Sequence, residues 1–238
     1  MTEIFTLWVG KTNPICRLCM KSWQRLDYSI IVYTDLDDYD PFLDQFKLKD
    51  YKKILDCPIK EMLPFSDLFR FIRLFLEGGI WVDADMFLLR KLPPYEYIIS
   101  SERTAQSGYY KREIQYIPNI GVLKFPPGCS LLKHVIEKIE NSRIKTDKCN
   151  KNMFIFQDAI LKTHTTWKEE VTDPEVYCPV NWANVKDLYY NDTFVSKYKQ
   201  EVNQADWILE NAVGVHLWEN FSINKYKIDF NKILIYTI

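Results

Sequence analysis

The chain has 238 residues, with 31 Lys and Arg against 32 Asp and Glu, a net charge of −1 and 47% hydrophobic residues. This composition is globular, and a chain of this length can bury a sizeable core in one domain. A nearly neutral chain gives no electrostatic reason to expect nucleic acid as a partner. No uncharged apolar run of 18 residues occurs, and residues 1–11 lack a signal-peptide pattern, so we expect a soluble, cytoplasmic protein without a transmembrane segment.

Six cysteines are scattered along the chain, as expected of reduced thiols in a cytosolic protein. Cys16 and Cys19 have the spacing of a zinc or redox pair. No second pair of Cys or His ligands follows, and residues 14–26 have helical apolar spacing. We therefore interpret both as ordinary helix residues.

The first 35 residues predict a strand, a helix and a second strand. Residues 4–10 are β-prone, residues 14–26 have helical spacing, and residues 28–35 (YSIIVYTD) are short and rich in β-branched and aromatic residues. A buried strand that ends in Thr-Asp suggests a parallel sheet, whose ligands bind at the carboxyl ends of its strands.

A polar, proline-containing segment separates this unit from the most apolar part of the chain. Ser66 is a candidate N-cap for a buried helix that runs to Glu77, where Gly78 and Gly79 stop it. Residues 80–89 (IWVDADMFLL) then predict a core strand that breaks at its aspartates.

The rest of the chain mixes strand and helix patterns. Residues 107–125 alternate as strands do, and residues 130–140 and 153–163 have helical spacing. Short strands and loops are expected in the C-terminal third, within residues 176–185, 212–221 and 232–236.

Asp83 and Asp85 are the chain's strongest candidate site. Residues i and i+2 of a strand point to one side, so the two carboxylates would share a face, about 6 to 7 Å apart at the backbone. Two anions this close repel unless a positive charge lies between them, and carboxylates with few other ligands suit Mn²⁺ or Mg²⁺. The pair would then bind a diphosphate through the metal; the alternative is a solvated turn at the strand end.

Asp67 and Arg70 are spaced i, i+3 in the first turn of the predicted helix and share a face. One interpretation is a structural ion pair. The other is ligand binding, because a carboxylate can bind sugar hydroxyls and the planar Arg side chain can bind a phosphate or a sugar.

The segment SDLFRFIRLFLEGGIWVDADMFLLRKL, residues 66–92, resembles the signature of glycosyltransferase family 32, the DXD sugar transferases. The resemblance implies a GT-A fold, an α/β Rossmann-like mixed sheet flanked by helices. It implies one domain over residues 1–238, with a donor half at about 1–92 and an acceptor half at about 93–238. It also implies retaining transfer of a sugar from a UDP- or GDP-sugar to a glycan or other hydroxyl acceptor, with Mn²⁺ or Mg²⁺ as cofactor.

The opening IFTLWVGK resembles the family's first strand, which implies that Trp8 stacks on the nucleobase. IPNIGVLKFPPG resembles the segment whose Asn lies near the donor sugar, which falls on Asn119. GVHLWENFS resembles the closing His-x-Trp motif, which implies that His216 or Glu219 is a late metal or phosphate ligand, although the Gly-Ser-Trp that often follows the His in this family is missing. The full set of implied donor-binding residues is Trp8, Val9, Asp67, Arg70, Trp81, Asp83 and Asn119.

Asp158, on the predicted helix 153–163, is a candidate catalytic base or acceptor-binding residue, with a solvated helix face as the alternative. His134 and His164 are interpreted as ordinary helix and loop residues.

Two other functions compete with sugar transfer. In a phosphohydrolase, Asp83 would be the nucleophile on the hydrophobic strand, but the motif lies mid-chain and is followed by Met86 and Phe87. The other is an inactive homologue that only binds a nucleotide sugar.

Overall fold

The structure is a computed structural model that describes residues 2–103, 116–143, 151–179 and 211–219. The strand patterns noted within residues 107–115, 180–185 and 232–236 lie outside the described residues, as does the end of the 212–221 segment.

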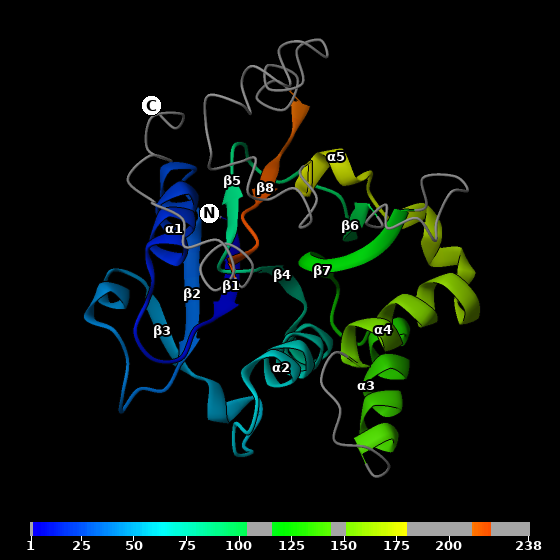
Figure 1. Cartoon of the computed structure of the whole chain (residues 1–238), viewed down its shortest axis with the longest axis horizontal. Helices are drawn as coiled ribbons and strands as arrows, with labels where there is room; N and C mark the ends of the chain where they lie inside the picture. Colours follow the sequence, from blue (N-terminus) through cyan, green and yellow to red (C-terminus); the bar gives the residue numbers. More distant parts are fainter. Residues whose placement is uncertain (1, 104–115, 144–150, 180–210, 220–238) are drawn as a thin grey trace.

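A six-stranded mixed sheet forms the centre of the fold, in the order β3-β2-β1-β4-β7-β6 (Figure 1). Strands β3, β2, β1 and β4 are parallel, and β7 is antiparallel to both β4 and β6. The predicted α/β mixed sheet flanked by helices is thus confirmed. The strands are β1 (Glu3–Leu7), β2 (Ser29–Thr34), β3 (Lys47–Asp50), β4 (Gly79–Val82), β6 (Ile98–Arg103) and β7 (Tyr116–Phe125).

Helices cover both faces of this sheet. Alternate residues of a strand face opposite sides, so Ile4 and Val32 belong to the core under α1, while Phe5 and Tyr33 belong to the core under α2, α3 and α4. Figure 1 shows α1 beside β2 and the other three helices grouped together. The helices are α1 (Pro14–Arg25), α2 (Met62–Glu77), α3 (Ser130–Arg143), α4 (Lys151–Asp158) and the short α5 (Pro174–Tyr177).

A second, two-stranded sheet lies against α1. Strand β5 (Met86–Leu88) pairs antiparallel with β8 (Gly214–His216), and Met86 is opposite His216. The Trp23 indole donates a hydrogen bond to the Met86 carbonyl at 2.8 Å, and the Leu88 N–H donates one to the Ser22 hydroxyl at 3.0 Å. These bonds fix the position of β5 relative to the main sheet.

Three sequence predictions need correction. Ser66 is not the N-cap of α2: the cap is Glu61, and the helix begins one turn earlier because Pro64 falls in the first turn, where a missing N–H costs nothing. Strand β3 was not predicted, since its sequence KLKD is polar and suits an exposed edge. The helix expected over 153–163 is α-helical only to Asp158 and continues as a π-helical turn, Ala159–Thr163.

Within the described ranges, no helix combines the length and the apolar character needed to cross a membrane.

Gly78 and Gly128 both have positive φ, at 63° and 73°, but only Gly78 is crowded. A Cβ at Gly78 would lie 2.7 Å from the Pro127 backbone nitrogen, whereas a Cβ at Gly128 would meet nothing within 4 Å. We expect Gly128→Ala to lose about 1 kcal/mol of unfolding free energy through backbone strain, and Gly78→Ala to lose roughly 2 kcal/mol or more. Urea denaturation of both variants would measure this, and equal losses would contradict the packing argument.

Candidate active site

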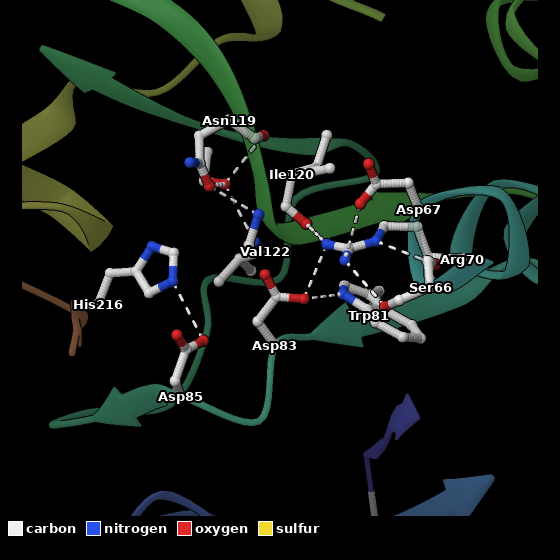
Figure 2. A network of polar contacts seen from close by, with 12 residues as sticks. Ser66, Asp67, Arg70, Trp81, Asp83, Asp85, Asn119, Ile120, Val122 and His216 are labelled. Carbon is white, nitrogen blue, oxygen red and sulfur yellow. Dashed lines mark hydrogen bonds and ion pairs between the residues drawn. The ribbon is translucent and has the colours of Figure 1, made fainter. Parts of the chain in front are cut away.

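Asp83 and Asp85 lie in the tight turn between β4 and β5, at the carboxyl end of the central strand (Figure 2). The Met86 N–H donates to the Asp83 carbonyl at 2.9 Å and closes the turn. The prediction that both residues share the face of one strand is therefore wrong, although the break at the aspartates is confirmed. The turn, rather than the pleat of a strand, brings the two carboxylates together.

Asp83 is held by Arg70, whose side chain is almost completely buried. One carboxylate oxygen, Oδ1, accepts hydrogen bonds from Arg70 Nη1 and from the Trp81 indole, each at 2.7 Å. Arg70 also donates to the Ile120 carbonyl at 2.7 Å and forms an ion pair with Asp67 at 3.3 Å. Among the described residues, nothing bonds to the second oxygen, Oδ2, which is therefore available to a ligand.

Asp85 is held by the strand β8 and the residues after it. Its Oδ1 lies 3.1 Å from His216 Nε2, and its Oδ2 accepts a hydrogen bond from the Glu219 N–H at 2.9 Å. The Leu217 N–H donates to the Asp85 carbonyl, also at 2.9 Å. Residues more than 130 positions away in the sequence thus fix this carboxylate.

Asp83, Asp85 and His216 each place one ligand atom within 4.8 Å of the other two. Two carboxylates and an imidazole are a donor set that suits Mn²⁺ or Mg²⁺, so the residues fit the cofactor expected from the sequence. Of the two alternatives for the third ligand, the structure brings His216 into this cluster.

The cluster carries strongly shifted pKa values. Burial, opposed by Arg70, raises the pKa of Asp83. Burial also opposes ionisation of Asp85 and His216, but their mutual attraction and contact dominate, so the pKa of Asp85 is lowered and that of His216 is well above its usual range. A cation bound here would replace the proton on His216, because a ligating imidazole must be neutral.

Glu219 lies beside this cluster, and its side chain forms a hydrogen bond with Asn13. Its Oε1 accepts a hydrogen bond from the Asn13 side-chain amide at 2.8 Å, and the Asn13 side-chain oxygen Oδ1 caps α1 by accepting from the Cys16 N–H at 2.9 Å. Burial, reinforced by the charge of Asp85, raises the pKa of Glu219 to about 7.

Among the expected donor-binding residues, Trp8 and Val9 lie at the end of β1, whereas Asp67 and Trp81 lie around Arg70. Trp8 and Val9 follow β1 at the carboxyl end of the sheet, and the Trp8 indole N–H is buried without a hydrogen-bond partner among the described residues. Asp67 and Trp81 instead brace Arg70: Asp67 is its ion-pair partner, and the Trp81 ring lies 4.7 Å from the guanidinium carbon. Burial, opposed by Arg70, raises the pKa of Asp67 to about 6.

Asn119 is buried next to Asp83, on the neighbouring strand β7. The Asp83 N–H donates to the Gly121 carbonyl at 2.8 Å, and the Gly121 N–H donates to the Asn119 side chain at 2.7 Å. The Asn119 amide donates at 2.8 Å to Glu102, a buried carboxylate on β6 that sequence reasoning missed. A single Glu in the strand IISSER belongs to no motif, so no signal in the sequence pointed to it.

The remaining candidates do not join this site. The Asp158 side chain is 61% exposed and pairs with Lys162 one turn away at 2.8 Å, and no described contact links it to the cluster. This geometry favours the solvated helix face over a catalytic role. His134 and His164 pack against each other, with ring centroids 4.6 Å apart.

The solved structures that resemble the chain include the PaToxG glycosyltransferase, 12% identical over 98% of this chain and 86% of its own, with a TM-score of 0.47. They also include the apo-form glycosyltransferase GlyE of Streptococcus pneumoniae TIGR4, 14% identical over 98% of this chain, with a TM-score of 0.46. The chain spans 62% of the GlyE structure. No curated protein matches the chain in sequence.

Two protein families match successive parts of the chain. Residues 1–114 match the family described as capsular polysaccharide synthesis protein. Residues 130–237 match the family described as the alpha 1,4-glycosyltransferase conserved region. The first match contains Asp83 and Asp85, and the second contains His216, so the cluster draws on both. Together these two matches, each over less than half of the chain, identify it as a glycosyltransferase.

Proposed function

We propose that this glycosyltransferase is metal-dependent and transfers a sugar from a nucleoside-diphosphate sugar, a UDP- or GDP-sugar, to a glycan or glycoconjugate hydroxyl. The observation that supports this most strongly is the cluster of Asp83, Asp85 and His216 at the carboxyl end of the central strand. Open α/β sheets bind ligands at this edge. Mn²⁺ or Mg²⁺ held by these residues would supply positive charge to the departing diphosphate.

The sheet order suggests how the donor lies. Trp8 and Val9 are on the side of β1 and β2, and Asn119 is on the opposite side of β4, on β7. We propose that the nucleoside binds against Trp8, the diphosphate at the aspartates, and the sugar towards β7. Residues of about 1–92 would then form the donor half, and residues of about 93–238 would form the acceptor half.

Arg70 prepares the site by compensating charge. Three acidic side chains, Asp67, Asp83 and Asp85, lie close together in a largely buried place, and Arg70 contacts two of them. It leaves Asp85 and the free oxygen of Asp83 to bind the cation, and it keeps Asp83 in one orientation. Such pre-organisation is what electrostatic stabilisation of a leaving group requires.

Retention of configuration remains part of the proposal. Inverting transfer needs a base beside the acceptor hydroxyl, and Asp158, the base candidate, lies on an exposed helix face. We also propose a cytoplasmic location, which the free thiols of the five described cysteines support.

The phosphohydrolase alternative is less compatible with the geometry. Asp83 would have to attack through Oδ2 alone, because its Oδ1 is fixed by Arg70 and Trp81, and the ion pair with Arg70 lowers the nucleophilicity of the whole carboxylate. An inactive homologue would keep the same geometry, so only an assay separates it from an enzyme.

The decisive assay follows release of nucleoside diphosphate from a panel of UDP- and GDP-sugars with Mn²⁺. We expect release that EDTA abolishes and that falls at least about 100-fold in Asp85→Asn, because the loss of a direct metal ligand should exceed the 10- to 100-fold cost of losing an outer contact. Asp44→Asn, at an exposed carboxylate that bonds to Tyr39, is the matched control and should keep full activity.

Other outcomes would point elsewhere. Donor binding without release would indicate the inactive homologue. If no nucleoside diphosphate is released from any donor and a generic phosphate ester is hydrolysed, the phosphohydrolase is favoured.

Trp8→Ala tests the position of the nucleobase. Stacking on an aromatic ring contributes about 1 to 3 kcal/mol per base, so we expect the variant to bind UDP or GDP roughly 5- to 150-fold more weakly in the presence of Mn²⁺. Titration calorimetry measures this directly. Trp167→Ala is the control, since Trp167 is also half-buried but packs against Tyr97 and Phe125. Equal affinities in Trp8→Ala and the unmodified protein would refute the stacking role.

A further inference from the structure

A buried polar group lies on β6 and β7, on the side of Asp83 away from Trp8. It consists of Ser100, Glu102 and Asn119, all 6% exposed or less. A Cβ built on Gly121 would lie 2.9 Å from the Asn119 carbonyl oxygen and 3.6 Å from Asp83 Oδ2. The side-chain oxygen of Asn119 and the free oxygen of Asp83 therefore lie close together beside Gly121, with the terminal methyl of Met86 next to them.

The hydrogen bonds of Asn119 leave it one unused group. Its side-chain oxygen accepts from the Gly121 N–H at 2.7 Å, and the Ser100 hydroxyl, which donates to the Asn119 backbone carbonyl at 3.1 Å, lies 3.3 Å from the same side-chain oxygen. Its side-chain nitrogen donates to Glu102 Oε2 at 2.8 Å. A primary amide has two N–H groups, and the described residues provide a partner for one of them. Asn119 can therefore offer a ligand one N–H donor.

Glu102 offers an unused hydrogen-bond acceptor, whereas Asn119 offers an unused donor. The described residues provide a partner for Oε2 and none for Oε1, although the residue is only 6% exposed. Burial raises the pKa of Glu102, while the hydrogen bond from Asn119 and the charge of His216 oppose this. Burying a carboxylate costs free energy that one hydrogen bond to an amide does not offset. The pair is therefore not expected to stabilise the fold.

The unused N–H of Asn119 is a donor, and the unused Oε1 of the neighbouring Glu102 is an acceptor. Such a pair is complementary to a hydroxyl group, which accepts one hydrogen bond and donates another. Sheet order puts the pair on the β7 and β6 side of Asp83, and Trp8 on the β1 side. A diphosphate at the aspartates with its nucleoside towards Trp8 would point its sugar at this pair.

We propose that Glu102 and Asn119 together bind one hydroxyl of the transferred sugar, with Asn119 as donor and Glu102 as acceptor, so that Glu102 determines donor specificity. This inference rests on the proposed function and adds to it a residue and a substrate feature. Ser100 and Gly121 fix the Asn119 amide in the orientation that this requires.

Glu102→Gln is the sharpest test because it keeps the shape of the side chain. The new carboxamide can still accept from Asn119 through its oxygen, and it then presents a donor where Glu102 presents an acceptor. The probes are UDP-glucose, UDP-galactose and GDP-mannose; the best-used donor is then compared with its monodeoxy analogues through kcat/KM for diphosphate release.

In the unmodified protein we expect one deoxy position to cost about 100-fold or more, because a site built around a hydroxyl rejects a substrate that lacks it. In Glu102→Gln this penalty should shrink to less than about 5-fold, while penalties at other positions and the affinity for UDP or GDP stay the same. Ser101→Ala is the control: it removes a buried hydroxyl that donates to the Thr172 carbonyl from the same strand and should leave every penalty unchanged.

The outcomes separate the two claims. If Glu102→Gln keeps the full set of deoxy penalties, or weakens UDP and GDP as much as the donor, Glu102 does not read the sugar and the inference fails while the transferase stands. If the unmodified protein neither binds nor cleaves any of the three donors, the proposed function is wrong. The inference about Glu102 is then wrong as well, because it rests on that function. Circular dichroism and a thermal melt of Glu102→Gln show whether its fold is intact.

Discussion

The buried guanidinium of Arg70 is the constraint on which the site depends. Several carboxylates in a place sheltered from water would repel one another and protonate, unless a fixed positive charge compensates them. Arg70 ties helix α2 to β4 through Asp83 and to β7 through the Ile120 carbonyl, with Asp67 on its other side. A planar cation with several donors in fixed directions can make all of these bonds at once, which a lysine could not. One side chain thus sets both the charge and the geometry of the central turn.

The second half of the site comes from far along the chain. Strand β8 pairs with β5 and carries His216 to Asp85, so the cluster of Asp83, Asp85 and His216 exists only when residues from the C-terminal third dock beside the first ninety. Contacts of such sequence separation form late and cost the most chain entropy. The carboxylate turn is therefore local in origin, whereas the complete cluster is a product of tertiary folding.

The sequence predicted the features that local patterns encode. Apolar spacing and the Gly78-Gly79 stop located α1, the end of α2 and β4, and the two aspartates marked the turn. It failed where tertiary context decides: β3 is a polar edge strand, and α2 begins before its apolar run. Glu102 could not be found at all, because its importance depends on an amide seventeen positions away on the adjacent strand and on no motif of its own. The resemblance pointed to Asp83, Asp85 and His216, but the geometry that brings these three residues together could not be derived from the sequence.

Asn13 shows how two unrelated demands meet in one side chain. Its side-chain oxygen Oδ1 caps α1, and its side-chain nitrogen Nδ2 donates a hydrogen bond to Glu219 at the edge of the cluster. Since the cap already fixes the side chain, holding Glu219 costs little further rotamer entropy. Aspartate or serine would cap the start of the helix equally well, yet aspartate would repel Glu219 and serine would be too short to bond to both partners. The start of the first helix is thereby tied to the closing motif, so a mutation chosen only to improve the helix could loosen the site at the opposite end of the sequence.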